Sequence, residues 1–547
     1  MTAPGDRDGR LAARILDTLL REDYAGFSHL VHRSKEGVAL HLPTGRRVPL
    51  TPGGLFQDFT VARAAHGLTV AEVLGALDRL ADPADRDGVA AFRRECEETL
   101  ATIALHDAHH RQTLDRLRPA DRHGPAGALY YDTLAAYTDH PVYPTGRCRL
   151  GLSQAELLAY APEFHPVFPL RWIAVPQPAP AGLPSWWPGP GDVGLPPAFE
   201  TGHTLYPVHP LTVPHLPLTE LGAVLGHTPY LPVVPTLSMR TVAVRDDPGS
   251  HLKLPLATST LGLRNRRSIK PGTLDDGARA EGLLRRILAR EPGARILVAD
   301  EQTHRHTGHE YAAWMLRRLP EVGPAAEIVS VASLLAPAPG GATVLAETAG
   351  RHGGGDPVAL LDEYLGVLLR WNVRLFVAYG VALEAHQQNL AMILGDGPLK
   401  LLVKDNDGLL ASPETLRGAG LPAPRFTDRR MLTDDPHSLA DVFVTITLHL
   451  ACAAVVFGAA QTGLLAVDTA GHLLRRRLAE ALDEHGSHPL ARLLRARTLD
   501  AARLVGKSMV IAGTLVDKTR SGARDVNKFY GTSGPNYLRA FRERKPA

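Results

Sequence analysis

The stretch EAHQQNLAMILGDGPLKLLVKDNDG, residues 384–408, constrains the fold of this chain more than any other segment. Two apolar runs, NLAMIL and LKLLV, flank the turn sequence GDGP. A turn of Gly, Asp and Pro between apolar runs is typical of a β-hairpin. We therefore predict a strand, a turn and a second strand, preceded by a helix that ends near Ala385.

Polar side chains stand at both open ends of the predicted hairpin. His386, Gln388 and Asn389 lie at the start of the first strand, and Asp405 and Asp407 follow the second. Because antiparallel strands joined by a short turn bring their far ends together, the two groups are expected to face each other. Such a cluster resembles the catalytic loop and the metal-binding aspartate of protein and aminoglycoside kinases.

The position of a kinase's catalytic base is changed in this chain. Gln388 stands where a kinase has an aspartate, and neither a Gly-rich loop with a strand lysine nor a GxxxxGK[ST] phosphate loop is visible. A nucleotide site without a base suits a nucleophile that is already ionised. A carboxylate that attacks the α-phosphate of ATP needs orientation and charge neutralisation but no proton removal, so acyl adenylation is the favoured chemistry.

Cations for such chemistry stand in two segments of the middle of the chain. In PTLSMRTVAV, Ser238 and Arg240 alternate with apolar residues, which predicts a strand, and Thr241 follows. In HLKLPLATSTLGLRN, Lys253 is expected on a second strand, with Arg264 beyond a Thr-Ser-Thr run. Two adjacent strands would aim these side chains at phosphates or carboxylates. The alternative is that each cation is a solvated or ion-paired surface residue.

The length and the local patterns predict an α+β protein in three parts. The chain has 547 residues, of which 44% are hydrophobic, and exceeds the usual size of one domain. Residues 1–139 carry apolar residues at helical spacing, and residues 140–350 hold short β-like runs between Pro- and Gly-rich turns. Residues 351–547 begin with a long helical pattern, followed by the hairpin and further helices.

Charge and cysteine usage narrow the class of partner. The net charge is only +3 and basic residues are interspersed with acidic ones, so small molecules are expected rather than nucleic acid. Three distant cysteines provide neither a disulfide framework nor a CxxC metal site, and the polar N-terminus lacks a signal-peptide core, which fits a cytoplasmic location. The apolar run at 442–460 is interrupted by Thr and His, which predicts a buried helix rather than a membrane span.

Two groups of histidines raise the question of a metal site. Neither group has the Cys or carboxylate partners that a zinc site requires at ligand spacing. We expect the first group to lie on a solvated helix face and the second in a surface loop. The first comprises His106, His109 and His110, and the second comprises His304, His306 and His309.

Six motifs in order resemble the synthetases that build siderophores independently of nonribosomal peptide synthetases. They are DHPVYPTGRCRLGLSQAELLAYAPEF, LRWIAV, LSMRTV, LKLPLATSTLGLR, EAHQQNLAMIL and KDNDG, and the resemblance runs from about residue 125 to GPNYL near the C-terminus. It implies a cupped hand of helical thumb (1–139), β-rich fingers (140–350) and palm (351–547), with ATP and Mg²⁺ held between fingers and palm.

The same resemblance implies the reaction. Members adenylate a carboxylate, with citrate or a similar polycarboxylate favoured here, and transfer the acyl group to an amine or alcohol with release of AMP and pyrophosphate. The resemblance also implies that this protein forms a homodimer.

Roles for single residues follow from the same resemblance. The contacts to ATP are expected from Ser238, Arg240, Thr241, Lys253, Gln388, Asn389 and Asp405, with Asp405 also near the metal. The catalytic contacts are expected from Arg264, a cation shared by the α-phosphate and the acyl substrate, from His386, and from Lys507 near the carboxylate substrate.

Several positions depart from the family pattern. The pattern His-Pro-x-His-Pro-x-x-Lys-x-Arg has Tyr143 at its second His, an inserted Gly146, and Arg147 and Arg149 at its basic positions, while Lys404 replaces an arginine. These changes predict a divergent member whose substrate differs from the common ones. Two alternatives stay open: a kinase-like phosphotransferase that releases ADP, and a catalytically impaired partner subunit that binds ATP without turnover.

Overall fold

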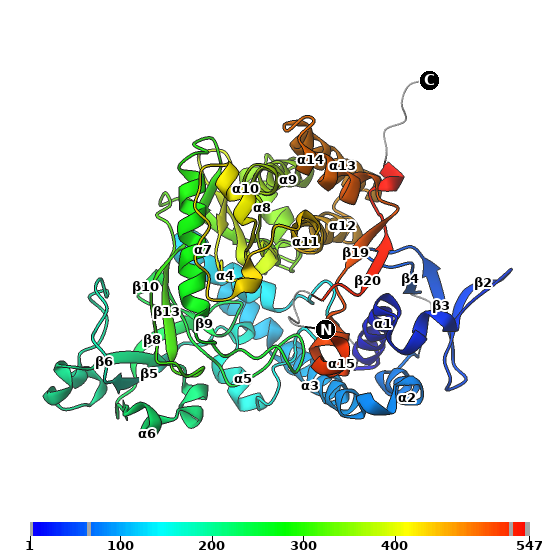
Figure 1. Ribbon diagram of the computed structural model, residues 1–547. Helices are drawn as coiled ribbons and strands as arrows, with labels where there is room; N and C mark the ends of the chain where they lie inside the picture. The colour runs from blue at the N-terminus through cyan, green and yellow to red at the C-terminus, as the bar shows by residue number, and fades with distance from the viewer. Residues whose placement is uncertain (1–3, 63–66, 524–528, 542–547) are drawn as a thin grey trace.

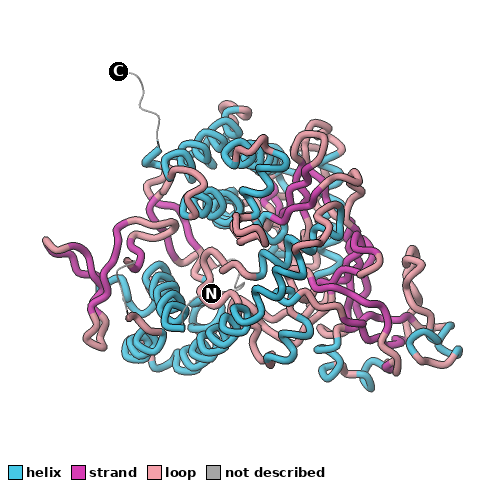
Figure 2. The backbone as a smooth tube through the Cα atoms, turned by 180° about the vertical axis from the view of Figure 1, so that it is seen from behind, coloured by secondary structure: helices cyan, strands magenta, loops and turns pink. Residues whose placement is uncertain are grey.

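The computed structural model describes residues 4–62, 67–523 and 529–541. In Figure 1 the C-terminal helices form the upper part, the N-terminal helices lie at the lower right, and a large sheet occupies the left side. Figure 2 shows the same arrangement from behind, with strands on both flanks of the helical centre. The mixture of helices and separate sheets confirms the predicted α+β class.

The N-terminal part is helical but contains a sheet that the sequence analysis missed. Its elements are α1 (Pro4–Glu22), β1 (Val31–Ser34), β2 (Gly37–His41), β3 (Arg47–Pro52), β4 (Phe59–Val61), α2 (Val70–Leu80), α3 (Arg86–Leu117) and α4 (Gly124–Ala136). The strands form an antiparallel sheet in the order β1-β2-β3-β4, which projects to the right in Figure 1. Alternating buried and exposed residues in β3 show the period of two that a half-buried strand requires.

The middle part is built on an eight-stranded sheet. Its strand order is β12-β13-β10-β9-β8-β5-β6, and β7 pairs with β5. The strands are β5 (Phe168–Val175), β6 (Thr204–Val208), β7 (Val224–Leu225), β8 (Tyr230–Pro235), β9 (Thr241–Val244), β10 (Asp247–Lys253), β12 (Asp300–His306) and β13 (Ala313–Arg318), and the helices are α5 (Gln154–Tyr160), α6 (Leu218–Leu221) and α7 (Thr273–Leu288). The antiparallel register sets Lys253 opposite Thr241, so the end of β10 lies beside the turn before β9.

The predicted hairpin is confirmed and forms the centre of a second sheet. Its strands are β16 (Leu390–Leu394) and β17 (Lys400–Val403), and β11 (Ile296–Val298) and β14 (Glu327–Ser330) complete the order β11-β17-β16-β14. Leu390 pairs with Val403, and the Lys404 N–H donates to the Asn389 carbonyl at 3.0 Å. The two open ends of the hairpin therefore meet. The division of the chain into three parts stays a prediction, and β11 and β14 come from the range assigned to the fingers.

The helix before the hairpin ends earlier than predicted. Helix α9 (Pro357–Arg374) continues as a π-helical turn to Tyr379, and Gly380 then adopts a φ of 62°. A glycine adopts the left-handed conformation at no steric cost, and its N–H then donates to carbonyl groups of the last helical turn, which ends the helix. The short strand β15 (Val381–Ala382) follows and pairs with β18 (Leu410–Ala411), so the predicted end near Ala385 was wrong.

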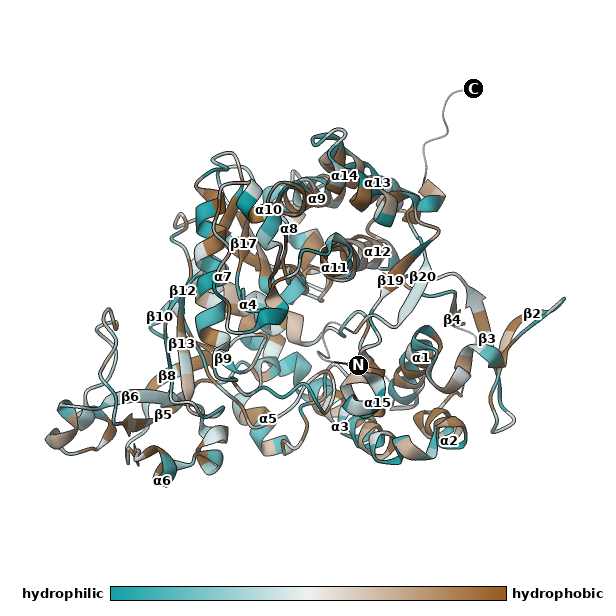
Figure 3. Ribbon diagram, in the orientation of Figure 1, coloured by the Kyte–Doolittle hydropathy of each residue, from teal (hydrophilic) through white to brown (hydrophobic). Residues whose placement is uncertain are grey.

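The remaining C-terminal elements are mostly helices around one long buried helix. They are α8 (Val344–His352), α10 (Pro413–Gly418), α11 (Pro436–Val442), α12 (Ala454–Gln461), α13 (Val467–Asp483), α14 (Pro489–Arg495), α15 (Lys518–Ser521), β19 (Arg503–Gly506) and β20 (Thr532–Pro535). A π-helical segment joins α11 to α12, and the resulting helix is 26 residues long with 94% of its most apolar window buried. Figure 3 shows its apolar ribbon at the centre of the upper part. This confirms the prediction of a buried helix.

The end of the chain returns to the N-terminal helices. Met509, Val510 and Leu515 belong to the same hydrophobic core as residues of α1, α2 and α3. The carboxylate of Glu22, at the end of α1, accepts hydrogen bonds from the backbone N–H groups of Val510 at 3.0 Å and Ile511 at 2.9 Å. The two ends of the sequence thus build one core.

The histidine groups lie in different environments from those predicted. His106 is only 1% exposed and packs edge-on against Tyr137 and Phe164, so a solvated helix face was the wrong interpretation for it. His304 and His306 lie on β12 rather than in a loop, and His304 contacts Asp275 at 3.2 Å. Across the described ranges, no group of three or more His, Cys, Asp or Glu side chains is placed to hold a metal ion.

Candidate active site

A cavity of about 450 Å³ lies where the large sheet meets the hairpin sheet and the C-terminal segment. It brings together eight of the ten side chains predicted to form the site. These are Ser238, Arg240, Lys253, His386, Gln388, Asn389, Asp405 and Lys507. Segments separated by more than 250 residues in sequence therefore converge on one chamber, as the motif order implied.

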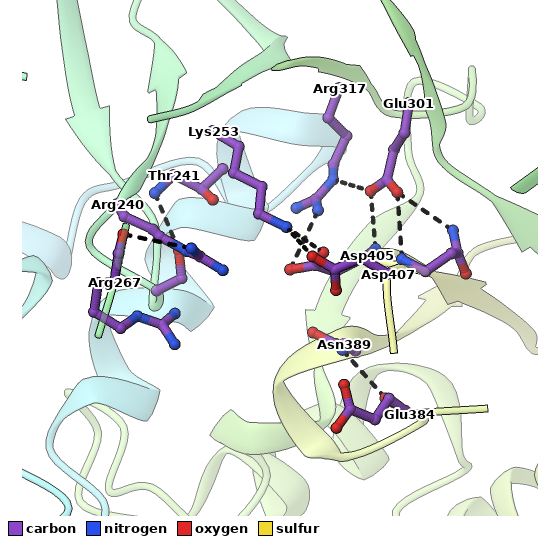
Figure 4. A network of polar contacts seen from close by, with 12 residues as sticks. Arg240, Thr241, Lys253, Arg267, Glu301, Arg317, Glu384, Asn389, Asp405 and Asp407 are labelled. Atoms are coloured by element: carbon purple, nitrogen blue, oxygen red, sulfur yellow. Dashed lines mark hydrogen bonds and ion pairs between the residues drawn. The ribbon is translucent and has the colours of Figure 1, made fainter. Parts of the chain in front are cut away.

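Lys253 joins the two walls of this cavity. The side chain is 2% exposed, and its Nζ donates to Asp405 Oδ1 at 2.6 Å and to Asp407 Oδ2 at 3.0 Å. Figure 4 shows the lysine reaching from the end of its strand to both carboxylates. A buried ammonium needs such partners because desolvation penalises an isolated charge. The predicted surface-cation alternative is therefore wrong for Lys253.

A second buried pair fixes the aspartate loop. Arg317 Nε donates to Glu301 Oε1 at 2.6 Å, and the same oxygen accepts the Asp405 N–H at 2.9 Å. Glu301 Oε2 accepts the Asn406 N–H at 3.3 Å. Asp405 has a φ of 65°, in the left-handed region that non-glycine residues rarely adopt. The hydrogen bonds to Glu301 hold the backbone in this conformation and aim the carboxylate at Lys253.

The charge state of Asp405 follows from its neighbours. Burial alone would raise the pKa of the carboxyl group, but the charges of Lys253 and Arg317 outweigh burial and hold that pKa well below its usual range. Asp405 is thus an anion at every physiological pH. Oxygen atoms of Asp405, Asp407 and Asn389 form the hard donor set that suits Mg²⁺, which commonly binds one or two carboxylates together with substrate phosphates.

Ser238 and Arg240 lie in a turn, not on the strand that the sequence predicted. The turn joins β8 to β9, and Met239 at its centre has a φ of 61°. Ser238 Oγ accepts the Thr241 N–H at 3.1 Å, and Arg240 donates to the Ser268 carbonyl at 3.1 Å. Both side chains reach the cavity, whereas Thr241 is 3% exposed and lies outside the cavity lining. The geometry does not place the Thr241 side chain at the expected ATP contact.

Arg264 also lies outside the cavity lining. Its guanidinium donates to the Thr514 carbonyl at 2.9 Å and approaches Asp517 at 3.9 Å, and its backbone N–H donates to the Gly513 carbonyl at 3.0 Å. Gly262 makes this approach possible, because a Cβ there would lie 2.9 Å from the Cα of Gly513. The geometry assigns Arg264 to the contact between this loop and the C-terminal segment.

Arg267, rather than Arg264, reaches the cavity from this loop, together with Arg266. Arg267 lines the cavity beside Arg240, as Figure 4 shows. Burial and the charge of Arg240 lower the pKa of Arg267 to about 9. The carboxylates of Asp405 and Asp407 raise this pKa but do not offset burial. The run RNRR carried the signal for a cation, but not for which arginine faces inward.

The hairpin ends supply neutral and polar groups. Burial, followed by the charge of Lys507, lowers the pKa of His386 to about 4, so the imidazole is neutral at pH 7. Asn389 donates from Nδ2 to the Glu384 carbonyl at 3.1 Å, which leaves its side-chain oxygen free to turn toward the carboxylates. Lys507 lines the same cavity from the C-terminal segment.

Tyr143, which stands where the family pattern has its second histidine, has a structural role. It is fully buried, and its hydroxyl donates to Glu95 Oε2 at 3.1 Å. The same carboxylate accepts from Thr145 at 3.0 Å, from Thr514 and from the Leu263 N–H at 3.1 Å. Glu95 therefore ties α3 to three loops around the cavity. The substitution changes a support of the site and removes no lining side chain.

Comparisons with known proteins agree with this geometry. A sequence profile of the IucA / IucC family matches residues 129–180 and 197–336, and one described as "Ferric iron reductase FhuF-like transporter" matches residues 359–515. Staphyloferrin A synthase of Staphylococcus aureus is 27% identical over 326 residues, which cover 53% of this chain and 54% of the relative. The uncharacterised protein y4xN of Sinorhizobium fredii is 26% identical over 330 residues, 52% of each chain. The matches span about half the length of these curated relatives.

Solved structures share the fold over nearly the whole chain. The petrobactin biosynthesis protein AsbB of Bacillus anthracis has a TM-score of 0.75 at 14% identity, covering 97% of this chain and 95% of its own. The aerobactin synthetase IucC of Klebsiella pneumoniae has a TM-score of 0.71 at 18% identity, covering 98% and 99%. ATP-bound IucA of the same organism has a TM-score of 0.67 at 19% identity, covering 97% and 99%.

These matches define the class of fold: an α+β fold that the chain shares with solved siderophore synthetases over nearly its whole length. Residues 129–180 and 197–336 match the IucA / IucC family in sequence as well.

Proposed function

We propose that this protein is an ATP-dependent, AMP-forming ligase that adenylates a carboxylate and joins it to an amine or alcohol in siderophore assembly. The observation that supports this most is the division of charge in one chamber: Arg240, Lys253 and Arg267 stand opposite Asp405 and Asp407. Triphosphate and metal need such a division. The ATP-bound state of the structural relative IucA supports ATP as the nucleotide.

In the first step, a carboxylate oxygen attacks the α-phosphate, and the bond to pyrophosphate breaks. Arg240 and Lys253 neutralise phosphate charge, and Arg267 attracts both the α-phosphate and the incoming carboxylate. No group has to remove a proton, because the carboxylate is ionised well above its pKa near 4. Gln388 at the position of a kinase base fits this requirement.

In the second step, the amine or hydroxyl group attacks the acyl carbon, and AMP leaves with the electron pair of the broken C–O bond. In this proposal the neutral imidazole of His386 donates or accepts one hydrogen bond at the acyl group, and Lys507, which lines the same cavity, provides a positive charge. Together they orient the adenylate toward the nucleophile.

Mg²⁺, when bound, would be held by Asp405, Asp407 and Asn389 and would neutralise phosphate charge. The ammonium group of Lys253 contacts the carboxylates of Asp405 and Asp407. When ATP and Mg²⁺ bind, this ammonium group would move from the carboxylates toward the phosphates. A carboxylate-rich substrate such as citrate suits the excess of arginine and lysine in the chamber, which also includes Arg147 and Arg149.

The nucleotide product tests the proposal. The protein is incubated with ATP, Mg²⁺ and each of citrate, 2-oxoglutarate and succinyl-hydroxamates, with and without amines, and AMP, ADP and pyrophosphate are quantified. AMP and pyrophosphate together with an amide or ester are expected. Stoichiometric ADP with a phosphorylated product would instead establish the kinase-like alternative, and ATP binding without turnover the impaired partner subunit.

A further inference from the structure

A second cavity, of about 390 Å³, lies between α1 and the long buried helix. Helix α1 contributes Arg14, Asp17 and Arg21, and α12 contributes Gln461 at the exposed margin. None of these four residues lines the first chamber. The cavity is therefore a separate space, formed by the N-terminal and C-terminal parts of the chain.

The two cavities share a wall. Thr138, Asp139 and Gln387 line both of them. Asp139 pairs with Arg147 Nε at 2.8 Å, and Gln387 donates to the Leu450 carbonyl at 2.8 Å. An elongated molecule in the second cavity would therefore have one end at the junction, next to the site of the acyl adenylate.

The second cavity has a carboxylate at the junction and arginines on α1. Asp139 supplies the carboxylate, and α1 supplies Arg14 and Arg21 together with Asp17. Glu22, which does not line the cavity, approaches Arg21 at 3.7 Å. Arg14 donates to the His140 and Tyr143 carbonyls at 2.8 and 3.1 Å, and the Nε atoms of both arginines have no hydrogen-bond partner among the described residues. Two guanidinium groups with unmet donors favour an oxygen-rich, anionic group beside α1.

Resting on the function proposed above, we propose that the second cavity binds the nucleophilic substrate as an amine that also carries a carboxylate. The ammonium end lies at Asp139 and the carboxylate end beside Arg14 and Arg21. A diamine leaves the arginines without an acceptor, and a second polycarboxylate places negative charge at Asp139. Asp139 lines both cavities, so the amine nitrogen at this carboxylate lies at the boundary between the two substrates.

The step that joins the substrates balances without further reactants. The ammonium loses a proton to water, its nitrogen forms a bond to the acyl carbon, and the C–O bond to AMP breaks. A second proton leaves the nitrogen as the amide forms, and AMP departs with the electron pair.

The test uses charge at Gln461, which lines only the second cavity and is solvent-exposed, so substitution there leaves the core intact. The probes are lysine and 1,5-diaminopentane, which differ only by the carboxylate, and hydroxylamine, which is small enough to trap the adenylate without the cavity. Wild type should show a KM for lysine at least about tenfold below that for diaminopentane, the scale of one charge-assisted hydrogen bond. Q461E should raise KM for lysine and lower KM for diaminopentane, each about threefold, and Q461K should do the reverse, as expected for exposed charges.

Hydroxamate formation should stay at the wild-type rate in both variants. The matched control is Gln154, an exposed glutamine on α5 that lines neither cavity, whose Glu and Lys variants should change no KM. A change of KM with the same sign for both amines, or equal KM values in wild type, would overturn the proposal.

A second arm separates this inference from the function on which it rests. Calorimetric titration of lysine and diaminopentane into the protein without ATP reports the cavity directly. If no carboxylate yields a hydroxamate, the proposed function fails, yet preferential binding of lysine that Q461E weakens would still support the cavity assignment. Hydroxamate formation without any preference for lysine in either arm refutes the cavity assignment alone.

Discussion

The two walls of the main chamber differ in how the chain builds them. The fingers wall presents cations from a strand end and two loops, at Lys253, Arg240 and Arg267, whereas the palm wall presents carboxylates and amides from one hairpin. One short turn brings the polar groups of the hairpin together, because the hairpin register determines where both strand ends lie, and Glu301 then holds the backbone at Asp405. The fingers groups depend on contacts between distant segments. The wall proposed to bind phosphate is therefore the one that substitutions elsewhere should disturb more easily.

The largest expected effect is at the contact between the walls. K253A removes the partner of Asp405 and Asp407 and the neutralising charge for phosphate, so adenylation should fall at least about a hundredfold. Stability should also fall by about 3 kcal/mol, because buried carboxylates lose their cation. R240A should lose adenylation to the same degree with little change in Tm. Pyrophosphate exchange and thermal melting measure the two effects, and near-normal exchange in both variants would remove the phosphate assignment.

The palm wall is tested by D405N, which keeps the size of the side chain and removes its charge. ATP-dependent activity should fall about a hundredfold, because the proposed metal ligand, which is also the partner of Lys253, becomes neutral. The fold should persist, since the Asp405 N–H still reaches Glu301. Activity is measured across a Mg²⁺ titration. An unchanged titration curve would reduce Asp405 to a residue that shapes the turn.

A smaller effect should separate two arginines of one loop. R267Q should lower adenylation roughly thirtyfold, corresponding to about 2 kcal/mol for a hydrogen bond to a charged group. R264Q should lower it less than about threefold, since Arg264 contacts the C-terminal segment outside the cavity. KM for the carboxylate is measured for both variants. The reverse order would restore Arg264 to the chamber and break the assignment of the fingers wall.

The substitution Q388E tests whether the palm wall tolerates another carboxylate. Q388E places negative charge near the ATP phosphates and should weaken adenylation about tenfold, on the scale of one charge pair at an effective dielectric constant of 20 with partial screening. It should not create phosphotransfer, because the carboxylate substrate has no proton to remove. The nucleotide product distinguishes the outcomes, and new ADP formation would favour the kinase-like alternative.

A separate effect, on stability rather than activity, is an acid destabilisation to which buried histidines of the fingers side contribute. Burial lowers the pKa values of His209 and His251 to about 3, while the unfolded chain titrates near 6.5. Their contribution to stability is complete above pH 6.5 and is lost as the pH falls toward 3. At pH 5 the penalty should be about 2 kcal/mol per histidine. Melting from pH 8 to pH 4.5 should show a decline in Tm below pH 6.5, which H251Q should reduce; a flat profile would contradict the burial argument.

Local patterns predicted one wall better than the other. The hairpin, and the proximity of its two open ends, were predicted from the turn of Gly, Asp and Pro, a signal that spans only a few residues. The turn that holds Ser238 and Arg240 depends on a left-handed Met239, for which the sequence carries no signal. The choice between Arg264 and Arg267 depends on the backbone contact of Gly262 with Gly513, about 250 residues later. The N-terminal sheet was missed because its strands are short and only partly buried.

The core shared by both ends of the chain has a consequence for biosynthesis. Helices α1 to α3 are made hundreds of residues before Met509, Val510 and Leu515, which complete their core. The carboxylate of Glu22 likewise waits for the N–H groups of Val510 and Ile511. Helices α1 to α3 must therefore remain incompletely packed until residues 509–515 have been made, with apolar surface open to chaperones. The support of the chamber through Glu95 and Thr514 forms only after that segment has left the ribosome, so a chain truncated before it would lack this support.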